Sequence, residues 1–450
     1  EVTDELKRLM KEFEKELAIL KGRVDGLEAR VGELEATQFS TTTKLKGQAT
    51  FVIGANSFGG NAKQGRLDAI YNTAAWSGRG DDDTFMGTNR ARAAAAASGA
   101  TSFNYDLRLF LDTSFTGKDL LRTMLRAGNF GDSAFGGGGY VGLDALETAF
   151  EEGSGPNSVG VNRLWYQFPL GSNFTATVGG LVRQDDMLAV WPSAYPADTV
   201  LDFFTYAGAP QTYNLALGQG GGLSFEKDDF SISANYVATG GDAFDGGANS
   251  NPNVGGIATD GAASSGTVQI AYAPENWGLA AAYNYASGDN GAGIYGGNGT
   301  PTAVFFSGLG TTNSLGLSAW WTPEEASWIP SISAGWGYNK VDIDNATIAG
   351  INGSIKGATS QSWYVGIQWA DAFLKGNTLG MAVGQPTFVT SWDNDTNVND
   401  GSDFVADGNY AWEWWYQFQV TDNISVTPAL YYLSRPLGYT TSNLDGASND

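Results

Sequence analysis

The spacing of apolar residues changes once along this chain, near Phe39, and the change separates two kinds of secondary structure. Before Phe39 the apolar residues recur every three or four positions, as they do on one side of an α-helix. After it, segments of roughly 10 residues alternate large apolar residues with polar or small ones. The sequence therefore predicts one helix followed by a long series of β-strands.

The segment 102–112 shows the strand pattern plainly. Successive side chains of a strand point to opposite faces, and one face of this segment is entirely large and apolar: Phe103, Tyr105, Leu107, Leu109 and Leu111. The residues between them are mostly polar, and the segment 410–420 repeats the same division. One face suits lipid and the other suits water, which is typical of strands in a membrane-spanning barrel.

From Lys44 to Arg435 we predict about fifteen strands, whose connections alternate in length. The short turns lie near 116–118, 169–173, 227–229, 274–276, 323–327, 375–377 and 421–423, and the long loops at about 57–100, 130–159, 184–219, 239–265, 287–313, 341–357 and 392–408. This alternation is expected when one rim of a barrel has tight periplasmic turns and the other carries extracellular loops. Because such a barrel needs an even strand number, we expect about sixteen antiparallel strands, the last of them missing from this sequence.

Residues 1–38 are predicted to form a coiled-coil helix in the periplasm, and residues 39–450 the transmembrane β-barrel. The apolar seam of the helix consists of Leu6, Leu9, Phe13, Leu17, Leu20, Val24, Leu27, Val31 and Leu34. So narrow an apolar stripe favours self-association over a lone helix. Valine at two a positions with leucine at d favours two helices, whereas a porin-like barrel favours three, and the sequence leaves both open.

The composition excludes several classes of function. The chain has no Cys and no His, so it lacks the Ser-His and Cys-His pairs of hydrolases and the usual zinc ligands. We therefore expect no enzyme activity, no cofactor and no metal centre. The formal net charge of -23 argues against nucleic acid as a partner. No apolar run approaches the roughly 18 residues of a membrane helix, so a membrane-spanning protein of this composition is expected to be a barrel.

Three stretches resemble one known family. TSFTGKDLLRTMLRAGNF (113–130), NRLWYQFPLGSNFTATVGG (162–180) and FSTTTKLKGQATFVIGA (39–55), together with the coiled coil, resemble the cyanobacterial outer-membrane porins related to the OprB-type carbohydrate-selective porins. The resemblance implies a trimeric barrel of sixteen strands in the outer membrane. It also implies an S-layer-homology domain, outside this sequence, that binds peptidoglycan or another cell-wall polymer. The family is associated with both sugars and inorganic ions, so the resemblance leaves the solute open.

Six basic residues are predicted to line one wall of the pore. With the large apolar residues facing lipid, the inward basic residues of the first five strands are Lys46, Arg108, Arg122, Arg126, Arg163 and Arg183. Inward positions of the middle strands are neutral and mostly small, so the positive wall would attract anions and orient dipolar solutes. The alternative is that the arginines pair with carboxylates such as Asp106 and Asp112 and only satisfy a polar lumen.

The third long loop, about 184–219, is predicted to fold into the barrel and form its constriction. Its aromatic and acidic residues are Asp185, Asp186, Trp191, Tyr195, Asp198, Asp202, Phe203 and Phe204. Large apolar rings gain by burial, and the barrel interior is the nearest place to bury them. The carboxylates would then face the arginines. The alternative is that the loop packs on neighbouring loops or on a second subunit.

These features predict an outer-membrane porin for passive diffusion of small hydrophilic solutes, chiefly inorganic ions. We expect it to contact outer-membrane lipid and to form a homotrimer. A carbohydrate-selective porin is the first alternative, in which the inward Trp165, Trp320 and Trp415 would stack on sugar rings. An alternative from another class is a structural tether between the outer membrane and peptidoglycan.

Overall fold

The computed structural model describes residues 2–37, 42–59, 98–137, 141–197, 200–239, 257–259, 262–287, 293–326, 328–347, 354–394 and 404–441. It contains one long helix, α1 (Val2–Thr37), and one large antiparallel sheet. The strands are β1 (Thr43–Gly54), β2 (Ser102–Thr113), β3 (Leu120–Gly128), β4 (Gly160–Leu170), β5 (Phe174–Arg183), β6 (Leu217–Lys227), β7 (Phe230–Ala238), β8 (Ser264–Tyr272), β9 (Trp277–Ser287), β10 (Thr311–Trp321), β11 (Ser331–Thr347), β12 (Ser354–Ala370), β13 (Thr378–Asn394), β14 (Tyr410–Thr421), β15 (Ile424–Val426) and β16 (Ala429–Ser434).

From β1 to β15 each strand pairs with the next one along the chain, β16 pairs with β14, and the sheet contains sixteen strands in all. This confirms the predicted all-β antiparallel architecture preceded by a helix. The last predicted strand is observed as two pieces, β15 and β16, which both pair with β14. Pro428 lies between the two pieces, and a proline has no backbone N–H to donate to a sheet.

Short and long connections alternate around the sheet as predicted, except between β11 and β12. The long loop expected at 341–357 is wrong, because β11 continues to Thr347 and β12 begins at Ser354, which leaves a connection shorter than the neighbouring turns. The extensions are held by an apolar cluster on the inner face of the sheet. This cluster includes Val341, Ile343, Ile355, Val389 and Trp392 of the strands and Phe306 of the short helix α3 (Pro301–Ser307).

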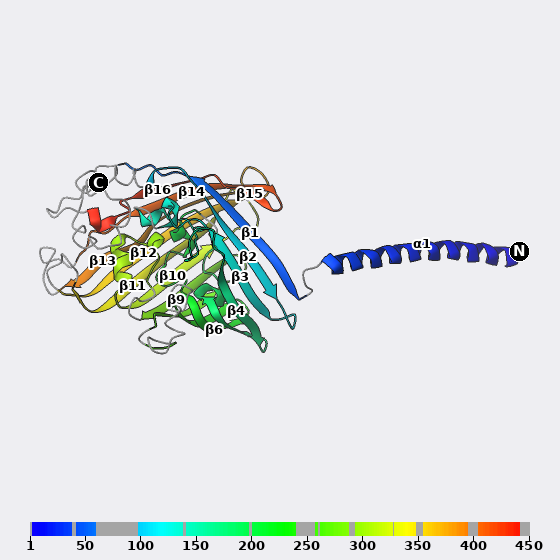
Figure 1. The fold of residues 1–450 in the computed structure, drawn as a ribbon, viewed down its shortest axis with the longest axis horizontal. Coiled ribbons are helices and arrows are strands. Elements are labelled where there is room, and N and C mark those ends of the chain that lie inside the picture. Colours follow the sequence, from blue (N-terminus) through cyan, green and yellow to red (C-terminus); the bar gives the residue numbers. More distant parts are fainter. Residues whose placement is uncertain are drawn as a thin grey trace.

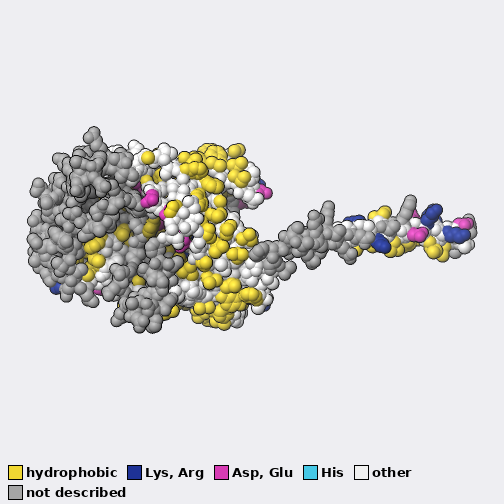
Figure 2. All heavy atoms as spheres, in the orientation of Figure 1, with side chains coloured by type: hydrophobic (Ala, Val, Ile, Leu, Met, Phe, Trp, Pro, Cys, Tyr) yellow, Lys and Arg dark blue, Asp and Glu magenta, His cyan; other side chains and the backbone are white. Residues whose placement is uncertain are grey.

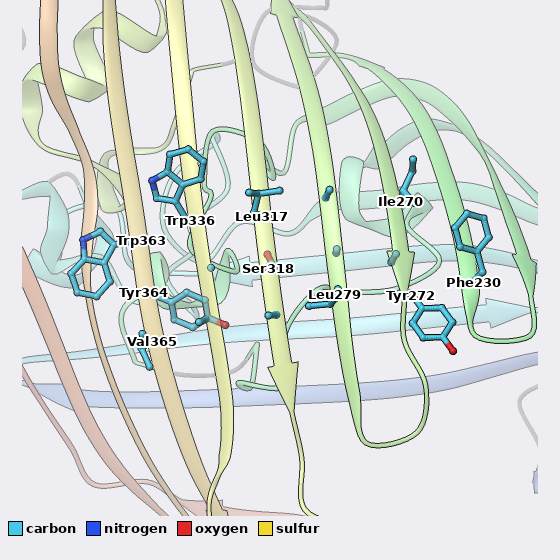
Figure 3. Close-up of a pocket in the computed structure, with 16 residues that line it drawn as sticks. Phe230, Ile270, Tyr272, Leu279, Leu317, Ser318, Trp336, Trp363, Tyr364 and Val365 are labelled. Carbon is cyan, nitrogen blue, oxygen red and sulfur yellow. The ribbon is translucent and has the colours of Figure 1, made fainter.

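The outer face of the sheet is apolar. Large side chains at alternate positions are exposed along the strands, and Figure 2 shows hydrophobic side chains gathered over them. Across β7 to β12 these side chains border a shallow groove. Figure 3 labels several of the residues that line it, among them Ile270, Leu279, Leu317 and Trp336. A continuous apolar outer face is what lipid contact requires of a barrel.

The two ends of the sheet approach each other through side chains. The Tyr431 hydroxyl of β16 donates a hydrogen bond to Asn56 Oδ1, just beyond β1. Val52 of β1 packs on the same apolar cluster as Tyr431 and Leu433. In Figure 1 the sheet curves round accordingly, and α1 extends away from the end where β1 begins. Among the described residues, no helix is both long and apolar enough to cross a membrane.

Asp119 organises the short turn between β2 and β3. Its Oδ1 accepts hydrogen bonds from the Phe115 and Thr116 amides and from the hydroxyls of Ser114 and Thr116, at 2.8–3.0 Å. Its Oδ2 accepts one from the Tyr166 hydroxyl of β4 at 2.7 Å. The Tyr166 hydrogen bond, helped by those of the turn, holds the pKa of Asp119 well below its usual range although burial opposes this.

We predict that Asp119→Ala lowers the thermal unfolding temperature in detergent by more than Tyr166→Phe does. The alanine leaves several turn donors without their acceptor, whereas the phenylalanine removes a single hydrogen bond. A lowered pKa contributes stability only while the carboxyl is ionised, so the effect of Asp119→Ala should shrink as the pH falls below about 4. Equal unfolding temperatures of Asp119→Ala and the parent at pH 7 would contradict this assignment.

Candidate functional site

Residues 184–216, between β5 and β6, form loop 3, which lies against the inner face of the sheet. Its backbone bonds to inward side chains of widely separated strands. These contacts are Ala189 N to Ser233 Oγ of β7 (2.9 Å), Gln269 Nε2 of β8 to Val190 O (2.7 Å), Ala194 N to Ser333 Oγ of β11 (2.8 Å) and Ser362 Oγ of β12 to Gly208 O (2.8 Å). A single segment reaches the same face of so many strands only because the sheet curves round it.

Glycines on the inner face make room for loop 3. A Cβ atom at Gly335 would lie 1.8 Å from the carbonyl oxygen of Ala207, and one at Gly366 would lie 2.6 Å from the Tyr195 ring. Both contacts are far shorter than real Cβ atoms allow. The small inward residues of the middle strands do point inward as expected. They do not form an open neutral wall, however, because loop 3 covers them.

The aromatic residues of loop 3 pack against this inner face of the sheet. Tyr195, Phe203 and Phe204 are almost completely buried. Trp191 is half-buried, and its ring lies 5.4 Å from that of Tyr213. Asp198, which sequence reasoning placed in the constriction, lies outside the described residues.

All six basic residues expected in the lumen make ion pairs. The pairs are Lys46–Asp112 (3.3 Å), Arg122–Asp112 (2.8 Å), Arg126–Asp106 (2.7 Å), Arg108–Asp106 (2.6 Å), Arg108–Glu147 (3.3 Å), Arg163–Asp186 (2.8 Å) and Arg183–Asp185 (2.5 Å). Arg126 and Arg122 each bind their carboxylate with two nitrogens. The pairing that was weighed as an alternative is therefore present.

The paired groups differ in how much solvent they reach. Arg122 and Arg183 keep 28% and 30% of their side-chain surface exposed, whereas Arg126 and Arg163 keep 10% and 6%. Lys46 is 64% exposed. Arg126 and Arg163 thus serve mainly to hold the strands and loop 3 together, whereas Arg122, Arg183 and Lys46 remain partly accessible to solvent.

The start of loop 3 places two carboxylates beside the arginines. Asp185 and Asp186 belong to a short 3-10 helix, η5 (Gln184–Met187), which begins directly after Arg183. Asp186 accepts hydrogen bonds from the Arg183 amide (2.9 Å) and from Arg163 Nε (2.8 Å). A bulge between Gly179 and Val182 shifts the register of β5 just before this point. The tight helical turn therefore brings acidic and basic side chains together.

Asp202 lies deeper, in the 3-10 helix η6 (Asp202–Thr205). It accepts a hydrogen bond from Asn298 Nδ2 at 2.8 Å and donates its amide to the Ala145 carbonyl at 3.0 Å. Burial, with the charge of Glu147, raises the pKa of Asp202 to about 7. Asp202 thus joins loop 3 to two neighbouring loops, and the charge of Arg183 acts against the rise of its pKa.

Sequence reasoning missed Glu413 and two loops that support loop 3. Glu413 is fully buried on β14 and binds Tyr195 and Leu201. In loop 2 (129–159) the Glu147 amide donates to the Val200 carbonyl at 3.1 Å, and the described part of loop 5 (293–310) supplies Asn298. Alternation does identify Glu413 as the one carboxylate facing inward on β14. No local signal indicates that its partners lie in loop 3.

A profile of the family described as "Carbohydrate-selective porin, OprB family" matches residues 3–448. The chain belongs to the OprB family. The match spans the helix, the whole sheet and the loops described above, so the resemblance seen in three short stretches is confirmed over nearly the whole chain. A porin of this family and fold is an outer-membrane protein.

Similar proteins are found in cyanobacteria. This OprB-family porin is 32% identical to an uncharacterized protein of Nostoc sp. (alr4550), over 96% of this chain and 68% of that protein. It is 28% identical to an uncharacterized protein of Synechocystis sp. (sll0772), over 96% of this chain and 72% of that protein. Its fold resembles the high-pH structure of Pseudomonas putida OprB, with a TM-score of 0.51 at 11% identity, over 89% of this chain and 90% of that one.

We predict that Gly335→Ala loosens loop 3. The added methyl group meets a backbone oxygen that cannot move alone, and such overpacking typically costs about 1–3 kcal/mol. Limited proteolysis should therefore cut loop 3 faster in this variant. The matched control is Gly266→Ala on β8, where the nearest atom to the new Cβ is 3.7 Å away. Equal cleavage of loop 3 in both variants would show that Gly335 does not determine how loop 3 packs on the sheet.

Proposed function

We propose that this porin lets small hydrophilic solutes, chiefly inorganic ions, cross the outer membrane by passive diffusion through a pore that loop 3 narrows. The observation that carries the proposal is the pair of partly exposed contacts Arg122–Asp112 and Arg183–Asp185. In this proposal they border the pore on the β1–β5 side. The basic wall, with Lys46 as its most exposed member, is then the selective surface.

Electrostatics favours ions as the main solutes. Guanidinium and carboxylate groups held side by side create a strong local field, and low-dielectric walls focus such fields. Charged rings of this kind determine ion preference in other pores. The Arg122 guanidinium also lies over the Phe110 and Trp165 rings, 5.2 and 5.3 Å from their centroids, which fixes its position.

Carbohydrate passage is the second candidate, and the family description supports it. Sugar binding by stacking needs open aromatic faces. Trp165 and Trp415 are only 4% and 6% exposed, and Trp415 lies flat over Gly380 of the neighbouring strand. Trp320 is similarly placed over Gly278. A sugar would therefore be bound by the charged groups and hydroxyls rather than by these rings.

We also propose that α1 joins copies of the porin in the periplasm, most simply as a homotrimer. The described seam residues from Leu6 to Leu27 are all 44–65% exposed in the single chain. Gly22 and Gly26 weaken an isolated helix by roughly 1 kcal/mol each. Partner helices would cover the seam and offset this weakness. The helix leaves the barrel at the rim of short turns, from which it would lead toward peptidoglycan or another cell-wall polymer.

Planar-bilayer recording tests the proposed solute directly. We expect stable open channels in potassium chloride whose current is little changed by millimolar sugars. Concentration-dependent block by a sugar, at concentrations that leave bulk conductivity unchanged, would instead favour the carbohydrate candidate.

We predict that the double variant Arg122→Gln and Arg183→Gln shifts ion preference toward cations. The change leaves Asp112 and Asp185 without their guanidinium partners at the exposed part of the wall. Reversal potentials in a salt gradient measure the shift. Lys227→Gln with Lys375→Gln removes the same charge from two exposed positions in short turns away from β1–β5 and should have no effect. Identical reversal potentials of the arginine variant and the parent would exclude these residues from the selective surface.

We predict that Leu20→Asp with Leu27→Asp lowers the stability of the oligomer in detergent and leaves the β signal of the barrel intact. Charges at the seam cannot be buried between helices without a large desolvation cost. Native gels at increasing temperature measure the effect. Substituting Arg8 and Lys21 with Glu is the control for charge alone. An oligomer as stable as the parent's would show that α1 does not join the subunits.

A further inference from the structure

Glu413 is the buried carboxylate that binds loop 3 to the far wall. It lies at an inward position of β14 and is fully buried. Its Oε1 accepts a hydrogen bond from the Tyr195 hydroxyl at 2.8 Å, and its Oε2 accepts one from the Leu201 amide at 2.8 Å. Within the described parts of the chain, no Lys or Arg forms an ion pair with it. Both of its oxygens are thus used as acceptors for loop 3.

The two contacts hold both ends of one short segment. Tyr195 and Leu201, which we call the tip of loop 3, are six positions apart in the sequence, and one carboxylate binds them both. The Tyr195 hydroxyl also accepts a hydrogen bond from Trp415 Nε1 at 2.8 Å, so β14 provides two of its partners. A rigid strand therefore fixes the separation of the two ends of this segment.

Other contacts of the same segment are less fixed. The Asp202 amide and side chain are bound by Ala145 and Asn298, which themselves belong to loops 2 and 5. The Tyr195 amide donates to Ser333 Oγ at 3.0 Å, but that contact holds one end only. Glu413 is distinguished by joining both ends to a strand.

We propose that Glu413 is a positioning residue that fixes the tip of loop 3 and thereby the width of the pore. Its effect on conductance rests on the proposed function, whereas its effect on the loop does not. A glutamine at this position has one oxygen and one NH₂ group, so with its oxygen on the Leu201 amide it presents a donor to the Tyr195 hydroxyl. That hydroxyl already accepts a hydrogen bond from Trp415 Nε1. Glu413→Gln should therefore weaken the hold on the Tyr195 end with almost no change in side-chain volume.

The absence of Cys from the sequence allows a direct test of the loop position. We would place a single reporter, Leu201→Cys, which is buried in the parent structure. We expect slow modification by a water-soluble maleimide in this background, and faster modification when Glu413→Gln or Tyr195→Phe is added. The matched control is Tyr213→Phe, since that hydroxyl is also fully buried in loop 3 but donates to Gln269 Oε1 of β8. It should leave the reporter protected.

Single-channel conductance of the same variants completes the test, with circular dichroism confirming an intact barrel. Faster modification together with a higher conductance for both Glu413→Gln and Tyr195→Phe, but not for Tyr213→Phe, supports the whole proposal. Unchanged protection of the reporter in both variants, or equal loss of it in Tyr213→Phe, overturns it. Faster modification with unchanged conductance shows that Glu413 positions the tip but overturns its role in setting the width of the pore.

Discussion

Every backbone polar group of loop 3 that is buried inside the barrel must find a hydrogen-bond partner, and this requirement determines what the inner face of the sheet can carry. Serine hydroxyls at Ser233, Ser333 and Ser362 supply such partners without filling the space. Where the loop backbone comes closest, as at Gly335, no side chain at all is possible. The neutral inner face of the middle strands is therefore a binding surface for the chain's own loop, and the proposed pore is displaced toward β1–β5.

The same displacement explains the distribution of charge. Removing one partner from a buried ion pair is strongly destabilising. Arg126 therefore needs Asp106, and Arg163 needs Asp186, which in turn holds the start of loop 3 to β4. Toward the open side the pairs become progressively exposed, and Lys46 is the most exposed of the six cations. Ion pairs thus join β1 to β2, β2 to β3 and β4 to the start of loop 3. In the proposed function the more exposed of these pairs also act on the solute.

Strand positions and inward parity could be predicted from the sequence because alternation is a local property of two successive residues. The aromatic content of loop 3 is local too, and the gain from burying rings such as Tyr195 and Phe203 favoured its inward course over the alternatives. The residue that anchors loop 3 to the sheet could not be predicted in this way. Glu413 is 218 positions from Tyr195 in the sequence, and nothing near either residue indicates the other. The extra length of β11 and β12 was missed for a similar reason, because their outer ends are stabilised by a cluster with α3 rather than by their own pattern.

The proposed pore depends most on loop 3 occupying the barrel interior. Single-channel conductance of a chain in which residues 188–204 are replaced by a short glycine-serine linker tests this directly. If loop 3 fills the space beside the arginine wall, the shortened chain should conduct markedly more current than the parent at the same salt concentration. A conductance equal to that of the parent would show that the loop lies outside the conducting path and would contradict the account.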